Sequence, residues 1–508
     1  MTFDPKAESL LVGVVGAGLM GRGIAQVALQ GGCRVKLFDT RPEAVQDACK
    51  FIGQMLKRAA EKGQMQAAEA DDAVARLVPA TRLEDLADCP VVIEAVIEDL
   101  GIKHKVFAAL EAIVAPEAVL VTNTSSLSVA SIAAVAKKPE RVAGFHFFNP
   151  VPLMKLVEVI DGVTTDPAVG EALMGLGRRF GREPVRMNDA PGFLVNQVGR
   201  GFNVETAHIA ADGVASFSDL DRILRDGAGF RMGPFELMDL TAIDVTHPAT
   251  ELLYRQTYDE PRYRPTSLMK LRLDAGLLGR KVGRGFYVYK DGKKQEAPEA
   301  PAPAYDGRPV WVSPVEAEGS AKLKAIVSAA GGKLESGAAP SAEALILVTP
   351  IGDDATSTAV AQGLDATRTL AVDTLFGLET RRTLMKTPVT RPEFTAAAHG
   401  LLGGGSVHAT VIHDTPGFVC QRVVAAIVNI GASVAQARVA APADVDKAVV
   451  LGVNYPKGPL AWADAVGPRN IVRILEGIQR VTGDPRYRPS PWLRRRAALG
   501  VSMLTPEA

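Results

Sequence analysis

The chain has few cysteines and no excess of charge of either sign. It contains only 4 cysteines in 508 residues, and no two of them form a Cys-x-x-Cys pair. This argues against a disulfide framework, a zinc ribbon and a thioredoxin-type site, so we predict no metal centre. The 57 Lys and Arg residues balance 57 Asp and Glu residues. A balanced chain has no electrostatic reason to bind nucleic acid or an anionic membrane, so we predict neither partner.

Long apolar runs are also absent. The uncharged stretch 118–136 is interrupted by Asn, Ser and Thr residues, which makes it too polar for a membrane-spanning helix. The first residues lack a basic segment followed by an apolar one, so we expect no signal peptide and a cytoplasmic location. With 47% apolar and 22% charged residues, the composition is that of a globular protein.

The first chemical motif is a strand, a glycine-rich turn, a helix and a second strand. Residues 10–15 form the apolar run of a buried parallel strand, and 22–29 have helical apolar spacing. Residues 34–39 are expected to form the second strand, which ends in an acid. This order is typical of a dinucleotide-binding βαβ unit. Its turn consists of Gly16, Ala17, Gly18, Leu19, Met20 and Gly21.

Each residue type in this unit has a role in binding a dinucleotide. Gly16 permits the tight turn, Gly18 lets the backbone approach a pyrophosphate, and Gly21 lets helix and strand pack closely. Asp39 would accept hydrogen bonds from a ribose 2′-hydroxyl and repel a 2′-phosphate, so we expect NAD rather than NADP. The neighbouring Arg41 could weaken that preference, and a merely structural glycine turn is the alternative.

Strands and helices alternate up to about residue 187, which favours a doubly wound parallel sheet. From 191 to about 283 the periodicity becomes helical, and the next segment is rich in Ala, Pro and charge, as in a linker. The expected strands are 91–96, 119–122 and 142–146, and the expected helices are 42–61 and 103–114.

The chain then repeats itself. Three blocks recur in the same order at a nearly constant offset, which predicts that the helical region occurs twice. The paired blocks are 188–195 with 413–420, 232–239 with 457–464, and 259–265 with 483–489.

The predicted fold class is an α/β Rossmann domain followed by an all-α domain, then a degenerate α/β segment and a second copy of the all-α domain. The length alone would suggest about three domains. We expect an NAD-binding domain at 8–187, a helical domain at 188–290, a linker at 291–309, a degenerate Rossmann-like segment at 310–410 and a second helical domain at 411–505.

A second chemical motif lies at 144–158. His146 ends an expected strand, two prolines break it, and an extended pattern resumes at 155–160. A strand returning after this loop would bring Glu158 back beside His146. Such a pair is a base with an orienting partner, suited to taking the hydroxyl proton when an alcohol is oxidised. A core histidine flanked by aromatic residues is the alternative.

These motifs together resemble the L-3-hydroxyacyl-CoA dehydrogenase family over about residues 8–290. The resemblance implies that His146 is the general base and Glu158 its partner, with NAD as cofactor and an acyl-CoA as substrate. It also implies that Ser125 and Asn149 contact the substrate oxygen and the nicotinamide, and that Asn196 completes the catalytic polar pocket. The resemblance is carried by Asp39 and by residues 16–21, 94–103, 123–127, 146–160 and 188–196.

The same resemblance implies further binding residues. Glu98, Lys103 and Lys281 match residues that contact the cofactor. Lys62 falls where a lysine near the CoA phosphates is expected, but Met55 replaces the neighbouring serine. A solvated helix face is the alternative for this lysine.

The glycine turn also resembles 3-hydroxyisobutyrate and 6-phosphogluconate dehydrogenases. Those enzymes use a lysine in a Gly-x-x-x-Asn-x-x-Lys helix. The corresponding frame begins here at Gly192, and its lysine position holds Gly199, which argues against that chemistry.

The second half lacks the chemical residues of the first. Counting by the repeat offset, Ala371 and Thr383 take the places of His146 and Glu158. No Gly-x-Gly-x-x-Gly turn is evident, so we expect a relic of the dinucleotide domain without its chemistry. Gln421 takes the place of Asn196 and is expected to be structural.

The function predicted is NAD-dependent oxidation of an L-3-hydroxyacyl-CoA to the 3-oxoacyl-CoA. The duplicated architecture resembles bacterial 3-hydroxyadipyl-CoA and 3-hydroxybutyryl-CoA dehydrogenases of phenylacetate and fatty-acid breakdown, so either substrate is open. We expect a homo-oligomer, such as a dimer. A non-catalytic, cofactor-binding structural protein on the same fold is the alternative, although it would have no need of the His146–Glu158 pair.

Overall fold

The computed structural model describes residues 3–296, 298–404 and 406–507. Contacts divide the chain into two compact units. The first unit runs up to Gln197 and includes Ala437–Val453, and the second contains Val198–Gln436 and the chain from Asn454 onward. None of the helices in the described part of the chain combines the length and apolarity needed to cross a bilayer.

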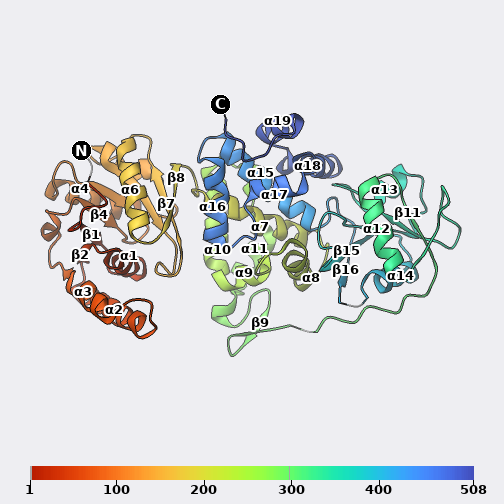
Figure 1. The fold of residues 1–508 in the computed structure, drawn as a ribbon, viewed down its shortest axis with the longest axis horizontal. Coiled ribbons are helices and arrows are strands. Elements are labelled where there is room, and N and C mark those ends of the chain that lie inside the picture. Colours follow the sequence, from red (N-terminus) through yellow and green to blue (C-terminus); the bar gives the residue numbers. More distant parts are fainter. Residues whose placement is uncertain (1–2, 297, 405, 508) are drawn as a thin grey trace. The chain divides into compact units, whose positions relative to one another are not determined.

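The first unit is built on an eight-stranded sheet (Figure 1). Neighbouring strands are parallel except for the sixth and seventh in spatial order, which are antiparallel. The predicted Rossmann-like parallel sheet is thereby confirmed. In spatial order the strands are β3 (Leu77–Pro79), β2 (Arg34–Phe38), β1 (Leu11–Val15), β4 (Val91–Glu94), β5 (Val119–Thr122), β6 (Val142–Phe147), β7 (Leu156–Asp161) and β8 (Glu183–Asn188).

Helices alternate with these strands. The helix predicted at 42–61 has those bounds. The helix predicted at 103–114 begins earlier, at Leu100, because the Asp99 side chain caps it by accepting a hydrogen bond from the Ile102 N–H group. The helices are α1 (Leu19–Gln30), α2 (Pro42–Glu61), α3 (Ala67–Ala75), α4 (Leu100–Ile113), α5 (Val129–Ala133) and α6 (Pro167–Arg179).

The strand order places a nucleotide-binding crevice between β1 and β4. The chain leaves β1 toward β2 on one side and later returns to β4 on the other side. In doubly wound sheets, ligands bind at this switch point, beyond the carboxyl ends of the strands. Both strands are almost fully buried, and apart from Glu94 at the end of β4 their side chains are apolar, as expected of parallel strands covered by helices on both faces.

One segment of the first unit comes from far along the chain. Ala440 forms an antiparallel bridge with Met187, and the helix α16 (Pro442–Val453) packs against β7 and β8. From the sequence we assigned this segment to the helical region at 411–505. In the structure it packs against the edge strand of the first sheet.

The second unit contains two groups of helices. The first group follows the first sheet in sequence, as predicted, and includes a short π-helical turn, Ile223–Gly227. The first helix of that group begins in the first unit. The groups are α7 (Val195–Ala211), α8 (Phe217–Arg222), α9 (Pro234–Thr241), α10 (Ile243–Gln256) and α11 (Ser267–Asp274), then α15 (Cys420–Gln436), α17 (Pro459–Val466), α18 (Pro468–Thr482) and α19 (Pro491–Leu499).

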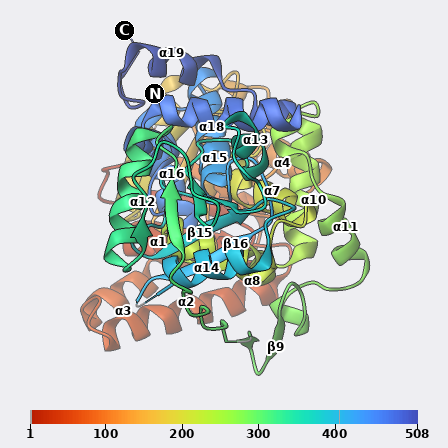
Figure 2. The same ribbon diagram turned by 90° about the vertical axis from the view of Figure 1, so that its right-hand side faces the viewer.

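The second unit also contains a six-stranded sheet with packed helices, seen facing the viewer in Figure 2. Its strands are parallel except for the fourth and fifth in spatial order. In spatial order they are β12 (Lys333–Leu334), β11 (Pro309–Val312), β13 (Leu345–Val348), β14 (Thr369–Val372), β15 (Arg381–Lys386) and β16 (His408–Ile412), with helices α12 (Ala317–Ala329), α13 (Ala355–Ala361) and α14 (Pro392–Leu402).

The segment predicted as a linker has some structure. A hairpin of β9 (Val288–Lys290) and β10 (Lys293–Gln295) occupies its start. Further on, the Glu299 carboxylate binds the Arg381 guanidinium, with one Nη1–Oε1 distance of 2.6 Å. The segment predicted as a linker therefore contacts the second sheet, at the start of β15. Ala297 lies outside the described residues.

Candidate active site

The glycine turn between β1 and α1 is shaped partly by packing and partly by an open space. A Cβ atom on Gly16 would lie 2.5 Å from the Ala95 carbonyl oxygen, and one on Gly21 would overlap the Gly16 carbonyl. Gly18, at the start of α1, differs because a Cβ there would meet no protein atom within 4 Å. The fold requires two of the glycines, whereas the third leaves room for a ligand phosphate at the helix N-terminus.

Asp39 lies beside this turn, at the end of β2. Its carboxylate accepts hydrogen bonds from the Ala17 N–H at 2.9 Å and from the Arg41 N–H at 3.0 Å. A cavity of about 530 Å³ extends from here between Phe38 and the start of α4, with apolar walls that include Ile97. An acid at the rim of an apolar cavity suits a nucleoside whose ribose hydroxyls donate to the carboxylate. The residues present therefore fit an adenine dinucleotide.

The predicted His–Glu pair is present. His146 on β6 and Glu158 on β7 are register partners in the antiparallel pair, and their Nδ1 and Oε2 atoms lie 2.6 Å apart. Both side chains are buried, at 5% and 0% exposure. Because a carboxylate only accepts hydrogen bonds, the imidazole Nδ1 carries the hydrogen and Nε2 is left as the proton-accepting atom.

The second carboxylate oxygen of this pair is held by the main chain. Glu158 Oε1 accepts hydrogen bonds from the N–H groups of Leu194 at 3.1 Å and Val195 at 2.9 Å. These amides follow a left-handed turn at Gly192 and Phe193, which have φ of +72° and +53°. These two amides could not be predicted from the sequence, because every residue except proline has a main-chain N–H group. The only available signal was the Pro-Gly-Phe turn that precedes them.

Three predicted cofactor residues form one cluster. The Glu98 carboxylate accepts hydrogen bonds from the Thr124 hydroxyl at 2.7 Å and from the Ser125 N–H at 2.9 Å. Lys103 is only 1% exposed, and its Nζ atom lies 2.7 Å from Glu94 and 3.3 Å from Glu98. Burial alone would raise the pKa of Glu98. The hydrogen bonds and the Lys103 charge outweigh burial and hold this pKa below its usual value.

The remaining predicted residues have more open surroundings. Ser125 and Asn149 are exposed, and Asn196 is half-buried directly after the Val195 amide. Lys281 belongs to the second unit, where it forms a 2.5 Å ion pair with Asp244. In the described part of the chain, no cluster of three or more His, Cys, Asp or Glu side chains could hold a metal ion.

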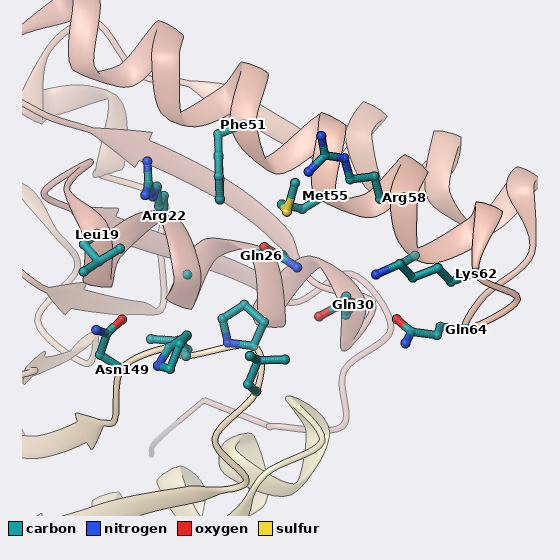
Figure 3. A pocket seen from close by; sticks show the side chains of 16 residues that line it. Leu19, Arg22, Gln26, Gln30, Phe51, Met55, Arg58, Lys62, Gln64 and Asn149 are labelled. Carbon is teal, nitrogen blue, oxygen red and sulfur yellow. The ribbon is translucent and has the colours of Figure 1, made fainter. Parts of the chain in front are cut away.

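A second cavity of the first unit lies between α1, α2 and the loop after β6 (Figure 3). Its volume is about 400 Å³, and the described residues that line it include three cations, Arg22, Arg58 and Lys62, and no acid. The Arg22 guanidinium lies 4.0 Å from the centre of the Phe51 ring. Lys62 was predicted from the sequence and Arg22 was not, since its only signal was a charge directly after the glycine-rich turn.

A nucleotide crevice, a glycine turn and a buried His–Glu pair define a nucleotide-dependent dehydrogenase. Comparisons with known proteins identify its family. The model of the 3-hydroxyacyl-CoA dehydrogenase NAD-binding domain matches residues 11–190, and that of the C-terminal domain matches 192–289 and 417–503. The chain belongs to the 3-hydroxyacyl-CoA dehydrogenase family. The predictions of the family, of NAD as cofactor and of a dehydrogenase are thereby confirmed.

Individual relatives cover different shares of the chain. A 3-hydroxyadipyl-CoA dehydrogenase of Escherichia coli strain K12 is 37% identical over 96% of this chain and 97% of its own length. A crystal structure of an E. coli K12 3-hydroxybutyryl-CoA dehydrogenase matches with a TM-score of 0.86 and 35% identity, over 97% of this chain and 98% of that one. A probable 3-hydroxybutyryl-CoA dehydrogenase of Bacillus subtilis is 39% identical but covers 55% of this chain and 96% of its own.

Proposed function

We propose that this protein oxidises an L-3-hydroxyacyl-CoA to the 3-oxoacyl-CoA at one active site, centred on His146 in the first unit. The observation that carries the proposal is the 2.6 Å contact between His146 and Glu158, with the carboxylate fixed by two amides. Relatives named for 3-hydroxyadipyl-CoA and for 3-hydroxybutyryl-CoA support these two as candidate substrates.

In this proposal His146 Nε2 takes the proton of the 3-hydroxyl group. NAD, when bound, accepts the hydride from C3, so the alcohol loses one hydride and one proton and becomes a ketone. The Glu158 carboxylate stabilises the imidazolium that forms, and it keeps the ring oriented because its other oxygen is held by the main chain. The imidazolium then releases its proton to water.

The residues that hold the cofactor and substrate follow from the same geometry. We assign the pyrophosphate to the 16–21 turn and the ribose to Asp39. We assign the substrate oxygen and the nicotinamide to Ser125, Asn149 and Asn196. The Lys103 Nζ atom lies 3.3 Å from the Glu98 carboxylate and would act by holding it in place. Lys281 remains a prediction based on the family resemblance.

We assign the CoA portion of the substrate to the cavity that carries Arg22, Arg58 and Lys62. Three cations without a lining acid suit a phosphate-rich ligand, and Phe51 and Met55 give an apolar wall for its pantetheine arm. The substrate is thus proposed to bind by local cations that the neutral charge of the whole chain conceals.

We also propose that residues 310–505 are a second copy of 8–290, with the domain boundaries given above. Two reciprocal ion pairs between the repeated blocks support the duplication. Arg264 of the first block binds Asp484 of the second at 2.6 Å, and Arg488 of the second binds Glu260 of the first at 3.8 Å. An interface between two helical domains is thus supplied within one chain, and the homo-oligomer remains a prediction.

The strand register of the second sheet corrects one counterpart. The Asp373 N–H group donates to the Thr383 carbonyl at 3.0 Å, so Asp373, and not Ala371, lies opposite Thr383. Asp373 therefore takes the place of His146 in the second copy. The repeat offset, counted along the sequence, missed this because 10 positions separate Asp373 from Thr383, whereas 12 separate His146 from Glu158.

An absorbance assay at the NADH wavelength tests the proposed function. The protein is supplied with 3-oxobutyryl-CoA and 3-oxoadipyl-CoA, each with NADH and with NADPH. NADH consumption with either thioester supports a dehydrogenase, and the ratio of kcat/KM values assigns the substrate. If the protein binds NADH but consumes none with these or longer 3-oxoacyl-CoA thioesters, it is the non-catalytic cofactor-binding protein instead.

A further inference from the structure

The segment Ala437–Val453, which we call the clamp segment, belongs to the first unit although its sequence neighbours on both sides belong to the second. Its first part pairs with β8. The Asn188 N–H donates to the Val439 carbonyl and the Asn188 side-chain amide to the Arg438 carbonyl, both at 2.8 Å. An edge strand exposes unpaired main-chain groups, and the clamp segment pairs with those at the end of β8, at Met187 and Asn188.

The second part of the clamp segment reaches the residues around the His–Glu pair. A Cβ atom on Gly452 in α16 would lie 2.7 Å from Val195 Cγ2 and 2.9 Å from Leu156 Cδ2. Val195 carries one of the two N–H groups that bind Glu158. Leu156 lies two residues before Glu158 on β7, so both side chains point to the same face of the sheet.

The clamp segment therefore touches both ends of the turn that holds Glu158. It binds Asn188, where β8 ends, and it contacts Val195, where the turn enters α7. Between these two points lie the left-handed residues Gly192 and Phe193. A displacement of either end would move the Leu194 and Val195 amides, which lie within about 3 Å of a fully buried carboxylate.

We infer that Gly452 is a positioning residue for the dehydrogenase reaction: it sets the distance between α16 and Val195, and so holds the amides that orient Glu158. This inference rests on the proposed function, because it assigns a task to the partner of the general base. It also gives the second half of the chain a task at the active site.

The test begins with Gly452→Ala. The added Cβ would meet both Val195 methyl groups, at 2.7 and 3.2 Å, so a rotation about the stiff valine χ1 brings no relief. Because alanine favours a helix more than glycine does, the helix itself is not weakened, and any loss of stability comes from the clash. We expect kcat to fall by about tenfold or more, as happens when a catalytic group is displaced by a fraction of an ångström, with the KM for NADH little changed.

Two further variants show whether the effect passes through Val195 and Glu158. Gly452→Ala combined with Val195→Ala removes the clash with Val195, leaves only the Leu156 Cδ2 atom at 2.9 Å, and should restore most of kcat. In a Glu158→Gln background, Gly452→Ala should change kcat less than twofold, because the group it disturbs is already lost. Val450→Ala, on the exposed side of the same helix, is the matched control and should leave kcat unchanged.

Hydrogen–deuterium exchange of the Leu194 and Val195 amides gives a readout that does not need activity. Exchange should be faster in Gly452→Ala and slow again in the double variant. If the original protein shows no dehydrogenase activity, the proposed function fails while the exchange result still tests the clamp. The inference is overturned if Gly452→Ala leaves both kcat and exchange unchanged, or if its full effect persists in the Glu158→Gln background.

Discussion

Each of the two sheets contains one antiparallel strand pair, and the two pairs carry different polar groups. Across β6 and β7, His146 faces Glu158, and the carboxylate receives two amides from the following turn. Across β14 and β15, Asp373 faces Thr383, and the Asp373 carboxylate receives the Leu375 N–H at 3.0 Å and the Gln421 amide at 2.9 Å. The first pair leaves one proton-accepting nitrogen available, whereas in the second pair the Asp373 Oδ1 atom already accepts hydrogen bonds from its neighbours.

The difference extends to the nucleotide end of each sheet. After β1 the chain makes the glycine turn, and Asp39 after β2 faces that turn. After β11 stands Ser313, which binds the Gln362 side chain, and Glu335 after β12 binds the Ser341 N–H within its own loop. A fold can thus retain its strands and core while polar groups at its ligand edge bind other groups of the protein. The polar contacts at this edge, and not the sheet itself, determine where chemistry occurs.

The largest effect is expected from replacing His146, the proposed general base of the first sheet. His146→Ala is expected to lower kcat by at least about a hundredfold, because general base catalysis typically contributes that much. NADH binding, followed by fluorescence, should persist because the nucleotide residues lie on other strands. His413→Ala removes an exposed histidine of the second half and serves as control. Near-normal turnover of His146→Ala would show that this pair is not the active site.

His146 is expected to affect turnover, whereas Asp373 is expected to make the stability of the fold depend on pH. Burial raises the pKa of Asp373 to about 6, although hydrogen bonds from Gln421 and Leu375 oppose the rise. A carboxyl group with a raised folded-state pKa stabilises the fold fully below its unfolded pKa, near 4, and this contribution is lost as pH rises through about 6. The contribution is on the order of 2 kcal/mol.

Asp373→Asn keeps an acceptor and removes the titration. Compared with the original protein, its melting temperature should therefore gain steadily between pH 4 and pH 7, while its kcat at a fixed pH stays unchanged. Calorimetry across this range measures the difference. A constant difference in melting temperature would mean that Asp373 does not titrate there, and a loss of kcat would mean that the second sheet contributes to chemistry.

Local features of both sheets could be predicted from the sequence. The glycine turn, Asp39 and the helix 42–61 follow from short-range spacing, since each depends on residues close together in the chain. The His146–Glu158 contact was also predictable, because a single loop forces the two strands back together. A motif can therefore be read from the sequence when one turn is enough to assemble it.

Features that depend on distant segments could not be predicted. The clamp segment joins β8 from about 250 positions along the chain, as the Asn188–Arg438 bond shows, and no local pattern marks such a pairing. The Leu194 and Val195 amides depend on φ values, not on side chains. Asp373 was passed over because the two facing residues are fewer positions apart in the second sheet than in the first, which only the strand register reveals.

Cofactor choice gives a smaller test of the same comparison. Asp39→Ala removes the group proposed to bind the ribose 2′-hydroxyl and to exclude a 2′-phosphate. The ratio of kcat/KM with NADH to that with NADPH should fall by about tenfold or more, the effect of losing one hydrogen bond to a charged group. Glu335→Ala, at the equivalent place in the second sheet, should leave the ratio unchanged. An unchanged ratio in Asp39→Ala would separate this acid from cofactor choice.

The smallest effect is expected at the cavity of the first unit that we propose binds CoA. Lys62 is exposed, so its attraction for a phosphate is screened, and Lys62→Ala should raise the KM for a 3-oxoacyl-CoA about two- to fivefold with kcat unchanged. The effect should shrink as salt increases and vanish with the N-acetylcysteamine thioester of the same acid, which has no phosphates. Lys50→Ala, on the same helix but outside the cavity, is the control. An equal rise in KM for both thioesters would place the lysine at the acyl group instead, and no rise for either would return it to a solvated helix face.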